Sequence, residues 1–392
     1  MERTDAYARR RRRPRRWAWI AAILCLCVVS LAAGYGAHSL VSGGGHAAAP
    51  PPVTYTTVTV TMTTAATTTP APPAPDRRTI SIAAVGDTML GSTPELPPSP
   101  GTYLAAMRAD LRADVVFGNL EGTLTDAMSS KCKPNAKDCF AFRVPPEFAS
   151  DLRSAGFTVM NNANNHSYDF GATGQADTVR ALHAAGIAQT GLPGEITVVH
   201  AGGLRVAILG FAPYSDTASL LDLATARALI HQADAKADMV MVAIHAGAEG
   251  TDAQHVTGAE ESYVGEDRGD AEAFAHMAVD AGADLVLGSG PHVLRGMELY
   301  HRRLIAYSLG NFAGYHNFGL DGVLGDSAVL HVRLTPKGAF HSARIRSVRL
   351  VDAGMPEPDP DGAGARLIAQ LSRDDLGSGA IRVTPAGRIT PR

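Results

Sequence analysis

The chain has 392 residues but only four cysteines, which limits the roles that thiols can have. Cys25 and Cys27 lie inside an apolar run, where thiols behave as small hydrophobic groups. Cys132 and Cys139 flank a polar segment, and this pair supplies too few soft ligands for a metal site. We expect the pair to close a small surface loop by a disulfide in an oxidising compartment.

Two common catalytic motifs are missing as well. The sequence contains no Gly-x-Ser-x-Gly elbow, and Gly288-Ser289-Gly290 is too short to be one. It contains no Gly-x-x-x-x-Gly-Lys-Ser/Thr loop, which would cradle the phosphates of a nucleotide. Hydrolysis by a serine nucleophile and the use of ATP are therefore disfavoured.

Charge is distributed unevenly along the chain. Residues 1–16 hold eight arginines against Glu2 and Asp5, a local charge of +6. Subtracting this from the whole-chain charge of −3 leaves −9 for the remainder. The segment that follows the arginines decides how they are interpreted, and it disfavours nucleic acid as a partner.

Residues 17–37 form a long apolar run, with Trp17 and Trp19 near its start and Tyr35 near its end. Its length suffices to span a bilayer, and aromatic residues are common at both membrane interfaces. The arginines before it place the N-terminus in the cytoplasm by the positive-inside rule. We expect an uncleaved transmembrane anchor with the main domain outside the cytoplasm; a cleaved signal peptide is the alternative.

Residues 38–77 are rich in proline and threonine. Such a segment has too little apolar surface to offset the entropy of ordering, and its prolines keep it extended. The alternation from Val58 to Thr61 could form a strand, but no apolar face continues it. We therefore predict a disordered stalk.

From residue 78 the pattern alternates between apolar β-type runs and helical segments, which predicts a layered α/β domain with largely parallel strands. Strands are expected at 79–85, 114–117, 157–160, 204–211, 238–244, 283–287 and 304–307. Helices are expected at 102–112, 145–155, 172–185, 219–235 and 270–281. The runs 327–334 and 341–351 predict an antiparallel pair at the sheet edge or in a second sheet. The domain is expected to end near 353, and residues 354–392 are expected to be a tail.

Polar residues follow the ends of these strands. They are Asp87, Asn119, Glu121, Asn165, His166, Asp169, His245, Glu249, His292 and Asn311. Taken singly, each of these residues can be explained by a structural role, as part of a turn, as a helix cap or as a hydrogen-bonded histidine. Because open α/β sheets bind ligands at the carboxyl ends of their strands, the set predicts one shared polar site.

Carboxylates, imidazoles and a side-chain amide are the ligands used for divalent ions such as Zn²⁺, Mn²⁺ or Fe²⁺. A bound ion would polarise a phosphoryl oxygen. A histidine beside the ion could then protonate the leaving group.

Six motifs in order resemble those of the CapA family of bacterial capsule and poly-γ-glutamate synthesis proteins. They are Val85-Gly-Asp-Thr-Met-Leu-Gly91, Gly118-Asn-Leu-Glu-Gly122, Asn164-Asn-His-Ser-Tyr-Asp-Phe-Gly171, His245-Ala-Gly-Ala-Glu249, Gly288-x-Gly-Pro-His-Val-Leu-Arg-Gly296 and Tyr307-Ser-Leu-Gly-Asn-Phe312. The family is similar in turn to the calcineurin-like metallophosphoesterases. That similarity implies a four-layer α/β/β/α sandwich. The resemblance to the CapA family covers about residues 79–335.

The resemblance also implies roles for individual residues. Asp87 would bind one metal ion and Asn165 a second, and Glu121 would be the carboxylate that bridges the two ions. His245 and His292 would complete the ligand shells. His166 would be the catalytic acid, and we group Asp169 with it. Asn119, Glu249, Ser289 and Asn311 are possible additional site residues.

Two positions depart from the phosphoesterase pattern. Phosphoesterases of this type carry an Asp-x-His motif on the first strand, and Met89 occupies the position of its histidine. They also carry a Gly-His-x-His motif near the end, where this chain has Ser289 and Gly290 before His292. Each departure removes an imidazole, so neither metal would keep a full shell of ligands unless Glu249 or Asp169 substitutes.

The sequence and its resemblance thus predict a membrane-anchored, extracytoplasmic CapA-like protein of capsule or poly-γ-glutamate-type polymer synthesis or export. Its site would be phosphoesterase-like and would hold one or two Mn, Zn or Fe ions. Its expected partners are the cell membrane, an anionic envelope polymer or its precursor, and other membrane subunits of a polymer synthesis complex. The alternative is a non-catalytic polymer-binding or accessory subunit.

Overall fold

The computed structural model describes residues 54–58, 79–133, 136–137 and 139–391. The predicted basic arm, apolar span and most of the stalk lie outside this part of the chain. None of the helices in the described part has both the length and the apolar character needed to cross a bilayer.

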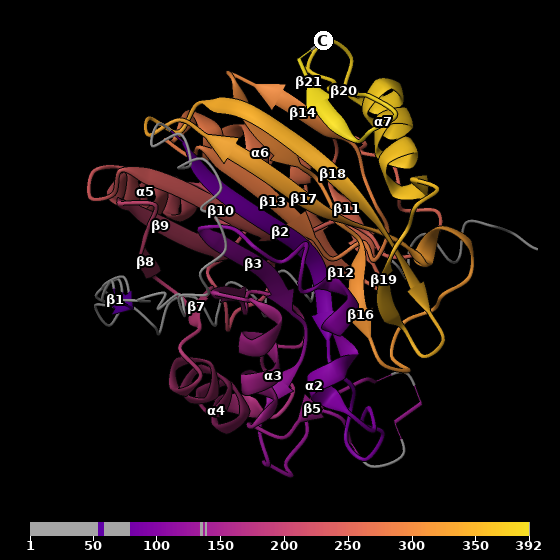
Figure 1. The fold of residues 1–392 in the computed structure, drawn as a ribbon. Helices are drawn as coiled ribbons and strands as arrows, with labels where there is room; N and C mark the ends of the chain where they lie inside the picture. The colour runs from indigo at the N-terminus through magenta and orange to yellow at the C-terminus, as the bar shows by residue number, and fades with distance from the viewer. Residues whose placement is uncertain (1–53, 59–78, 134–135, 138, 392) are drawn as a thin grey trace, which may run out of the picture. The chain divides into compact units, whose positions relative to one another are not determined.

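Two large sheets organise the described residues (Figure 1). The seven-stranded sheet has the order β1 (Thr54–Val58), β8 (Glu195–Ala201), β9 (Leu204–Phe211), β10 (Met239–His245), β13 (Leu285–Ser289), β15 (Arg303–Ala306), β14 (Met297–Tyr300). The ten-stranded sheet has the order β20 (Arg382–Val383), β21 (Arg388–Thr390), β18 (Phe340–Val351), β17 (Asp326–Leu334), β2 (Ile80–Met89), β3 (Val115–Leu120), β6 (Val159–Asn161), β7 (Ala188–Thr190). In addition, β16 (Asn311–Gly314) pairs with β2, and β19 (Met355–Pro358) pairs with β18. The predicted α/β class is confirmed.

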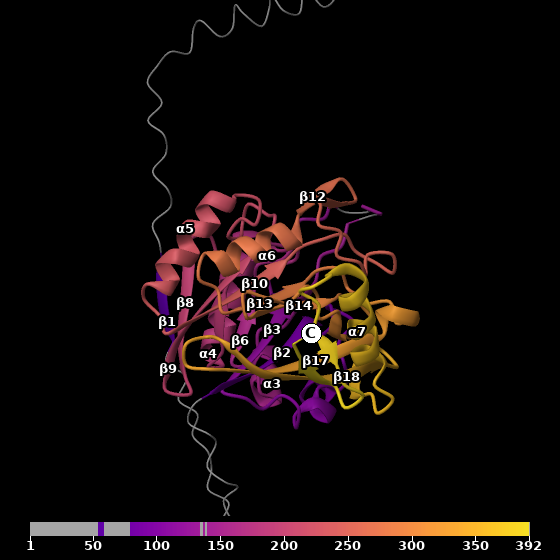
Figure 2. The same ribbon diagram turned by 90° about the horizontal axis from the view of Figure 1, so that it is seen from above.

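Helices pack on the outer faces of the two sheets, on that of the ten-stranded sheet only in part, and the sheets pack on each other through their inner faces (Figure 2). Side chains of α5 (Leu223–Asp234) and α6 (Ala271–Asp280) form one core with the seven-stranded sheet. Side chains of α2 (Pro100–Tyr103), α3 (Phe148–Ala155) and α4 (Gly171–Ala184) form another with the ten-stranded sheet. A third core lies between the sheets.

Strand β10 illustrates why the central strands are apolar throughout. Met239, Met241 and Ala243 belong to the core between the sheets, whereas Val240, Val242 and Ile244 pack toward the helices. Both faces are therefore buried, as the unbroken apolar run predicts. The expected central strand at 238–244 is confirmed.

The late antiparallel pair is also confirmed. Strands β17 and β18 pair antiparallel, and β17 continues the sheet beside β2. Their side chains alternate between the inner core and the outer face of the sheet, with Leu330 and Ile345 inside.

Three expectations differ from the structure. Strand β1 lies within the predicted stalk; its backbone pairs with the edge of β8, which needs no apolar face. The predicted helix at 102–112 is only α2 followed by a 3₁₀ turn at Ala105–Met107. The predicted tail folds into β19, α7 (Ala363–Asp375), β20 and β21, because α7 buries apolar side chains such as Ile368 and Leu371.

The central strands of both sheets present their carboxyl ends to one region. Asp87 on β2 accepts a 3.3 Å hydrogen bond from the backbone of Gly290, which follows β13 of the other sheet. Two small strand pairs, β4 (Thr123–Leu124) with β5 (Arg143–Val144) and β11 (Glu261–Tyr263) with β12 (Glu266–Gly269), lie in the connecting loops. This region is the site predicted from the sequence.

Candidate metal centre

Asp87, Glu121 and His292 come together, with one ligand atom from each lying within 4.8 Å of the others. The Nδ1 atom of His292 is 3.3 Å from Asp87 Oδ2, and its Nε2 atom is 3.5 Å from Glu121 Oε1. Both carboxylates are fully buried. Two carboxylates and an imidazole suit a borderline divalent cation.

Glu121 is the strongest sign that a cation belongs here. Within the described part of the chain, neither of its buried carboxylate oxygens has a hydrogen-bond partner. Burial raises the pKa of Glu121 well above its usual range, and the partial charge balance from His292 does not reverse this. A buried carboxylate without hydrogen bonds is costly unless a cation neutralises it. His292 lies 3.5 Å from Oε1 and supplies part of that charge, and the residues present also fit a metal ion.

The backbone holds His292 in place at a positive φ of 60°. Its Nδ1 atom lies 2.8 Å from Asn311 Oδ1, which fixes the plane of the ring. Burial alone would lower the pKa of His292, but Glu121, Asp87 and Glu249 outweigh it and raise the pKa to about 10. The site thus favours positive charge at this ring, the charge that a metal ion would supply.

A network of amides positions Asp87. Asn119 Nδ2 donates to Asp87 Oδ1 at 2.8 Å, and Asn119 Oδ1 accepts from Asn161 and Asn164 at 2.8 and 3.2 Å. Asn119 therefore serves to orient the ligand. The sequence did not assign roles to Asn161 or Asn164, although the run of asparagines after β6 was the available signal.

His245 lies beside the cluster and is engaged elsewhere. Its Nε2 atom is 3.4 Å from the guanidinium of Arg268, and its Nδ1 atom is 3.4 Å from Asn119 Nδ2 and 3.3 Å from Ser289 Oγ. Burial first, then the charge of Arg268, lowers the pKa of His245. The ring is therefore neutral and held by neighbours.

Arg268 is buried, which the sequence did not predict, because nothing in the segment Gly-Glu-Asp-Arg indicates an internal position. Its Nη1 atom donates to Glu249 Oε1 at 2.8 Å and to the Tyr214 hydroxyl at 2.9 Å. Glu249 Oε2 in turn lies 3.7 Å from His292 Nε2. Arg268 thus places a permanent positive charge next to His245.

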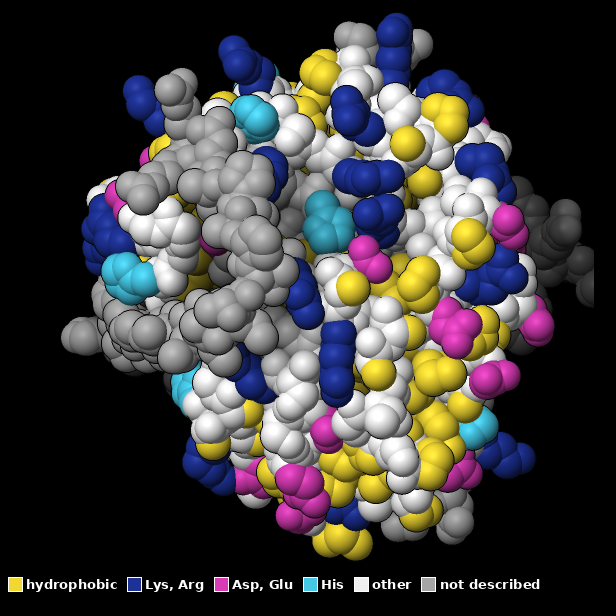
Figure 3. Space-filling model, viewed as in Figure 1, with side chains coloured by type: hydrophobic (Ala, Val, Ile, Leu, Met, Phe, Trp, Pro, Cys, Tyr) yellow, Lys and Arg dark blue, Asp and Glu magenta, His cyan; other side chains and the backbone are white. Residues whose placement is uncertain are grey.

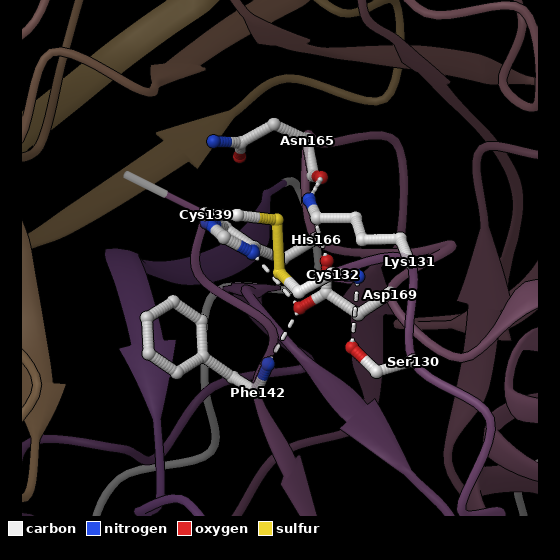
Figure 4. The surroundings of a disulfide bond; sticks show 8 residues. All are labelled: Ser130, Lys131, Cys132, Cys139, Phe142, Asn165, His166 and Asp169. Carbon is white, nitrogen blue, oxygen red and sulfur yellow. Dashed lines mark hydrogen bonds and ion pairs between the residues drawn. A yellow bond between two sulfur atoms is a disulfide. The ribbon is translucent and has the colours of Figure 1, made fainter. Parts of the chain in front are cut away.

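His166 and Asp169 form a separate pair beside the Cys132–Cys139 disulfide, and His166 lines a cavity that borders the site (Figure 4). The Nδ1–H group of His166 donates to Asp169 Oδ2 at 2.9 Å, which leaves Nε2 for the cavity. Asp169 Oδ2 also accepts from the backbone of Phe142 at 2.6 Å, and Lys131 Nζ lies 2.7 Å from Asp169 Oδ1. The predicted catalytic residues are therefore in contact.

The remaining predicted residues lie around these two groups. The Asn165 backbone oxygen accepts from Lys131 Nζ at 2.9 Å, and its buried side-chain oxygen has no partner among the described residues. Ser289 Oγ donates to the Ile244 carbonyl at 3.3 Å. A cavity of about 240 Å³ borders the site and is lined by Met89, Glu121, Phe140, Phe142, His166, Glu249, Gly250, Tyr263, His292, Asn311, Asn317, Phe318, Gly319 and Leu324.

A second group of possible ligands, Glu272, His276 and Glu298, has a different character. Glu298 Oε1 lies 2.7 Å from His276 Nε2 and accepts from the Tyr307 hydroxyl at 2.5 Å. These hydrogen bonds satisfy the buried carboxylate without a metal. The Asp87 group is therefore the better candidate.

Comparison with known sequences decides the family. The family described as "Bacterial capsule synthesis protein PGA_cap" matches residues 81–315, more than half of the chain. The chain belongs to this family. The resemblance of the six motifs is thereby confirmed.

Two curated PGA_cap relatives illustrate the match. The capsule biosynthesis protein CapA of Bacillus anthracis is 27% identical over 332 residues, which cover 78% of this chain and 76% of the relative. The PGA biosynthesis protein CapA of Bacillus subtilis strain 168 is 28% identical, covering 59% of this chain and 63% of the relative. Among solved structures, the 5'-nucleotidase precursor of Thermus thermophilus matches with a TM-score of 0.40 at 14% identity, covering 76% of this chain and 59% of that one.

The disulfide expected in this PGA_cap protein is present between Cys132 and Cys139. It links residues seven positions apart, next to Lys131, which pairs with Asp169 (Figure 4). On its other side follow Phe140 and Phe142, which line the cavity. The disulfide therefore helps to hold one wall of the site.

Removing this bridge should destabilise the domain. We expect Cys132→Ser with Cys139→Ser to lower the free energy of unfolding by about 2 kcal/mol, since the reduced loop is short. Urea unfolding with and without reductant measures this. Reductant should bring the parent down to the variant and leave the variant unchanged; an equal drop in both would contradict the prediction.

Proposed function

We propose that this protein is a metal-dependent hydrolase that acts on a phosphoester or related linkage of a capsule or poly-γ-glutamate-type polymer or its precursor. The observation that carries the proposal is Glu121, whose two buried oxygens lack hydrogen-bond partners among the described residues, beside Asp87 and His292. A group of cation ligands of which Glu121 and His292 line a cavity is suited to substrate activation.

The chain's own residues divide the work. Asp87, Glu121 and His292 would hold a divalent Mn, Zn or Fe ion, which when bound supplies Lewis acidity toward a phosphoryl oxygen. Asn119 keeps the Asp87 carboxylate in position. Because Arg268 engages His245, we infer one ion, with the guanidinium providing the second positive charge.

His166 would donate the proton to the leaving group. Its Nδ1–H group is held by Asp169, so Nε2 faces the cavity. The carboxylate of Asp169 orients the ring and is itself held in place by Lys131. General acids of this kind contribute about 10²–10⁴-fold to rate.

We also propose that residues 17–37 anchor the protein in the cell membrane and that the domain lies outside the cytoplasm. The apolar run and the arginines before it support this orientation. The Cys132–Cys139 disulfide fits an oxidising compartment. In that position the protein would work with other membrane subunits of a polymer synthesis complex.

The metal site can be tested with Glu121→Gln. At a hundredfold excess of Mn²⁺ or Zn²⁺ over its Kd, an ion should stabilise the metal-stripped parent by about 2.7 kcal/mol. The variant should lose this stabilisation, because a neutral amide cannot balance the ion. Thermal unfolding with and without the ion measures the effect, and elemental analysis should give one ion per parent chain.

Glu298→Gln is the matched control. It alters the second group of ligand-type residues, in which Glu298 is satisfied by His276 and Tyr307. This variant should retain the full stabilisation by the ion. Equal stabilisation of Glu121→Gln and the parent would show that the ion binds elsewhere.

A non-catalytic accessory role is the second candidate. It is favoured by the residues that replace imidazoles, Met89 and Ser289, both of which are buried at the site. A deletion strain distinguishes the two functions. Restoration of polymer by the His166→Ala protein would support the accessory role, and failure of restoration with normal protein levels would support the hydrolase.

A further inference from the structure

A second hollow lies on the outer face of the ten-stranded sheet, away from the metal centre. It has a volume of about 470 Å³ and is lined by Ser81, Ile82, Arg112, His331, Val332, Arg333, Ser342, Ala343, Arg344, Ala386 and Arg388. The helices leave this part of the face open. On the same face of β17 and β18, Val329 and Val348 are covered by the core under α2 and α3, whereas Arg333 and Arg344 are exposed.

Four arginines give this hollow its character. Arg112, Arg333, Arg344 and Arg388 are exposed, and no carboxylate of the described residues lies within ion-pair distance of them. The neighbouring Arg346 differs, since its Nε atom is 3.6 Å from Asp110 Oδ1. Figure 3 shows Lys and Arg side chains gathered on this face. The four guanidinium groups thus carry charge without an ion-pair partner, and the acid at the edge of the lining, Asp114, accepts a hydrogen bond from Ser81 at 2.6 Å.

Two of the guanidinium groups are held in place by the protein. Arg333 Nη1 donates to Thr79 Oγ1 at 3.0 Å, and Arg344 Nε donates to the Ala386 carbonyl at 3.0 Å. Each group keeps further N–H donors for a ligand. No lysine lines the hollow as far as the described residues form it. Arginine binds planar carboxylates through two parallel hydrogen bonds, which lysine cannot do.

The positive charge is local, because the chain beyond residue 16 carries a net charge of −9. Bulk charge would therefore repel a polyanion from most of the domain. From the open, arginine-lined hollow we infer a binding site for an extended polyanionic chain with repeated carboxylates, such as poly-γ-glutamate. This inference rests on the proposed function and adds a site that holds the polymer outside the cavity.

A polymer fits this hollow better than a membrane surface does. Proteins that lie on membranes insert apolar side chains next to their basic residues. The exposed large hydrophobic residues of the described chain are Met128, Phe140, Tyr168, Leu221, Leu223, Tyr263 and Val264, and none of them lines the hollow. A concave, basic surface without exposed large apolar groups suits a flexible acidic chain.

The hollow and the metal centre are separate along the sheet. Ser81 lines the hollow near the start of β2, and Asp87 lies near the end of the same strand. Six residues of β-strand span about 20 Å. A polymer bound in the hollow therefore need not occupy the cavity beside Glu121 and His292. Binding in the hollow and ion binding at the candidate metal centre can be tested independently.

The test uses the full chain in detergent with fluorescein-labelled poly-γ-glutamate as the probe. Arg112→Ala with Arg388→Ala removes two arginines that make no ion pair in the described structure. Fluorescence anisotropy should show a roughly tenfold loss of affinity, the effect of two exposed charge contacts. The control is Arg227→Ala with Arg373→Ala, which removes the same charge from exposed positions on α5 and α7.

The outcomes separate this inference from the proposed function. Weaker binding in the hollow variant alone, with ion stabilisation unchanged, supports the site whether or not the protein hydrolyses anything. An equal loss of affinity in the hollow variant and in the control variant would show that only the overall charge matters, and would overturn the inference. It would also be overturned if phosphatidylglycerol micelles, but not the polymer, bound in a way that depended on Arg112 and Arg388.

Discussion

Replacing His166 with alanine should slow hydrolysis of an alkyl phosphodiester by about 10²–10⁴-fold. The alkoxide is a poor leaving group and needs the proton that Nε2 of His166 would donate. Hydrolysis of bis-p-nitrophenyl phosphate should fall much less, because p-nitrophenolate leaves without protonation. The measurement is kcat for both substrates with the parent and the variant.

The test depends on the difference between the losses in kcat for the two substrates, because a structural defect would slow both reactions alike. Asp169→Asn should show the same selectivity with a smaller loss, since it removes the group that orients the ring at Nδ1. His200→Ala, an exposed histidine on β8, serves as the control and should leave both rates unchanged. Equal losses on both substrates in the His166 variant would exclude the general-acid role.

The second large effect concerns stability. Arg295 is fully buried and binds both carboxylate oxygens of Glu261, at 2.8 and 2.7 Å. Its Nε atom also donates to the Ala253 carbonyl at 2.7 Å. These bonds tie the segment that carries Glu249 and Arg268 to the loop after β13. Arg295→Met should lower the free energy of unfolding by about 3–5 kcal/mol, because Glu261 loses its only close cation among the described residues.

An exposed pair provides the matched comparison. Arg205 and Asp238 lie 2.9 Å apart, with side chains that are 51% and 38% exposed. Arg205→Met should therefore cost less than about 1 kcal/mol. The double variant Arg295→Met with Glu261→Met should recover much of the loss, since it removes the uncompensated charge. Urea unfolding measures all three, and similar costs for the buried and the exposed arginine would refute the prediction.

The sequence predicted those features that follow from local pattern. The unbroken apolar run at β10 required burial on both faces, and the polar residues after β2, β3 and β13 indicated a common edge. The six motifs identified the family correctly. Asp87, Glu121 and His292 accordingly meet as expected, and Cys132 pairs with Cys139.

Other features depend on contacts that no local pattern encodes. Arg268 and Arg295 lie in ordinary surroundings in the sequence, and only the folded chain buries them beside carboxylates. The tail after residue 353 has glycines and prolines at its start, which concealed the amphipathic helix α7. The hollow on the outer face draws its arginines from four separate segments, so the net charge of the chain gave no sign of it.

The joining of the two sheets at the metal centre also determines the order of events in the life of the protein. Gly290 meets Asp87 across 203 positions of sequence, so the ligands cannot assemble until most of the domain has been synthesised and folded. Because a site that is formed by folding can bind an ion only afterwards, the proposed metal ion would be bound after folding. If the domain folds outside the cytoplasm, where we propose that it lies, its ion would come from the cell envelope.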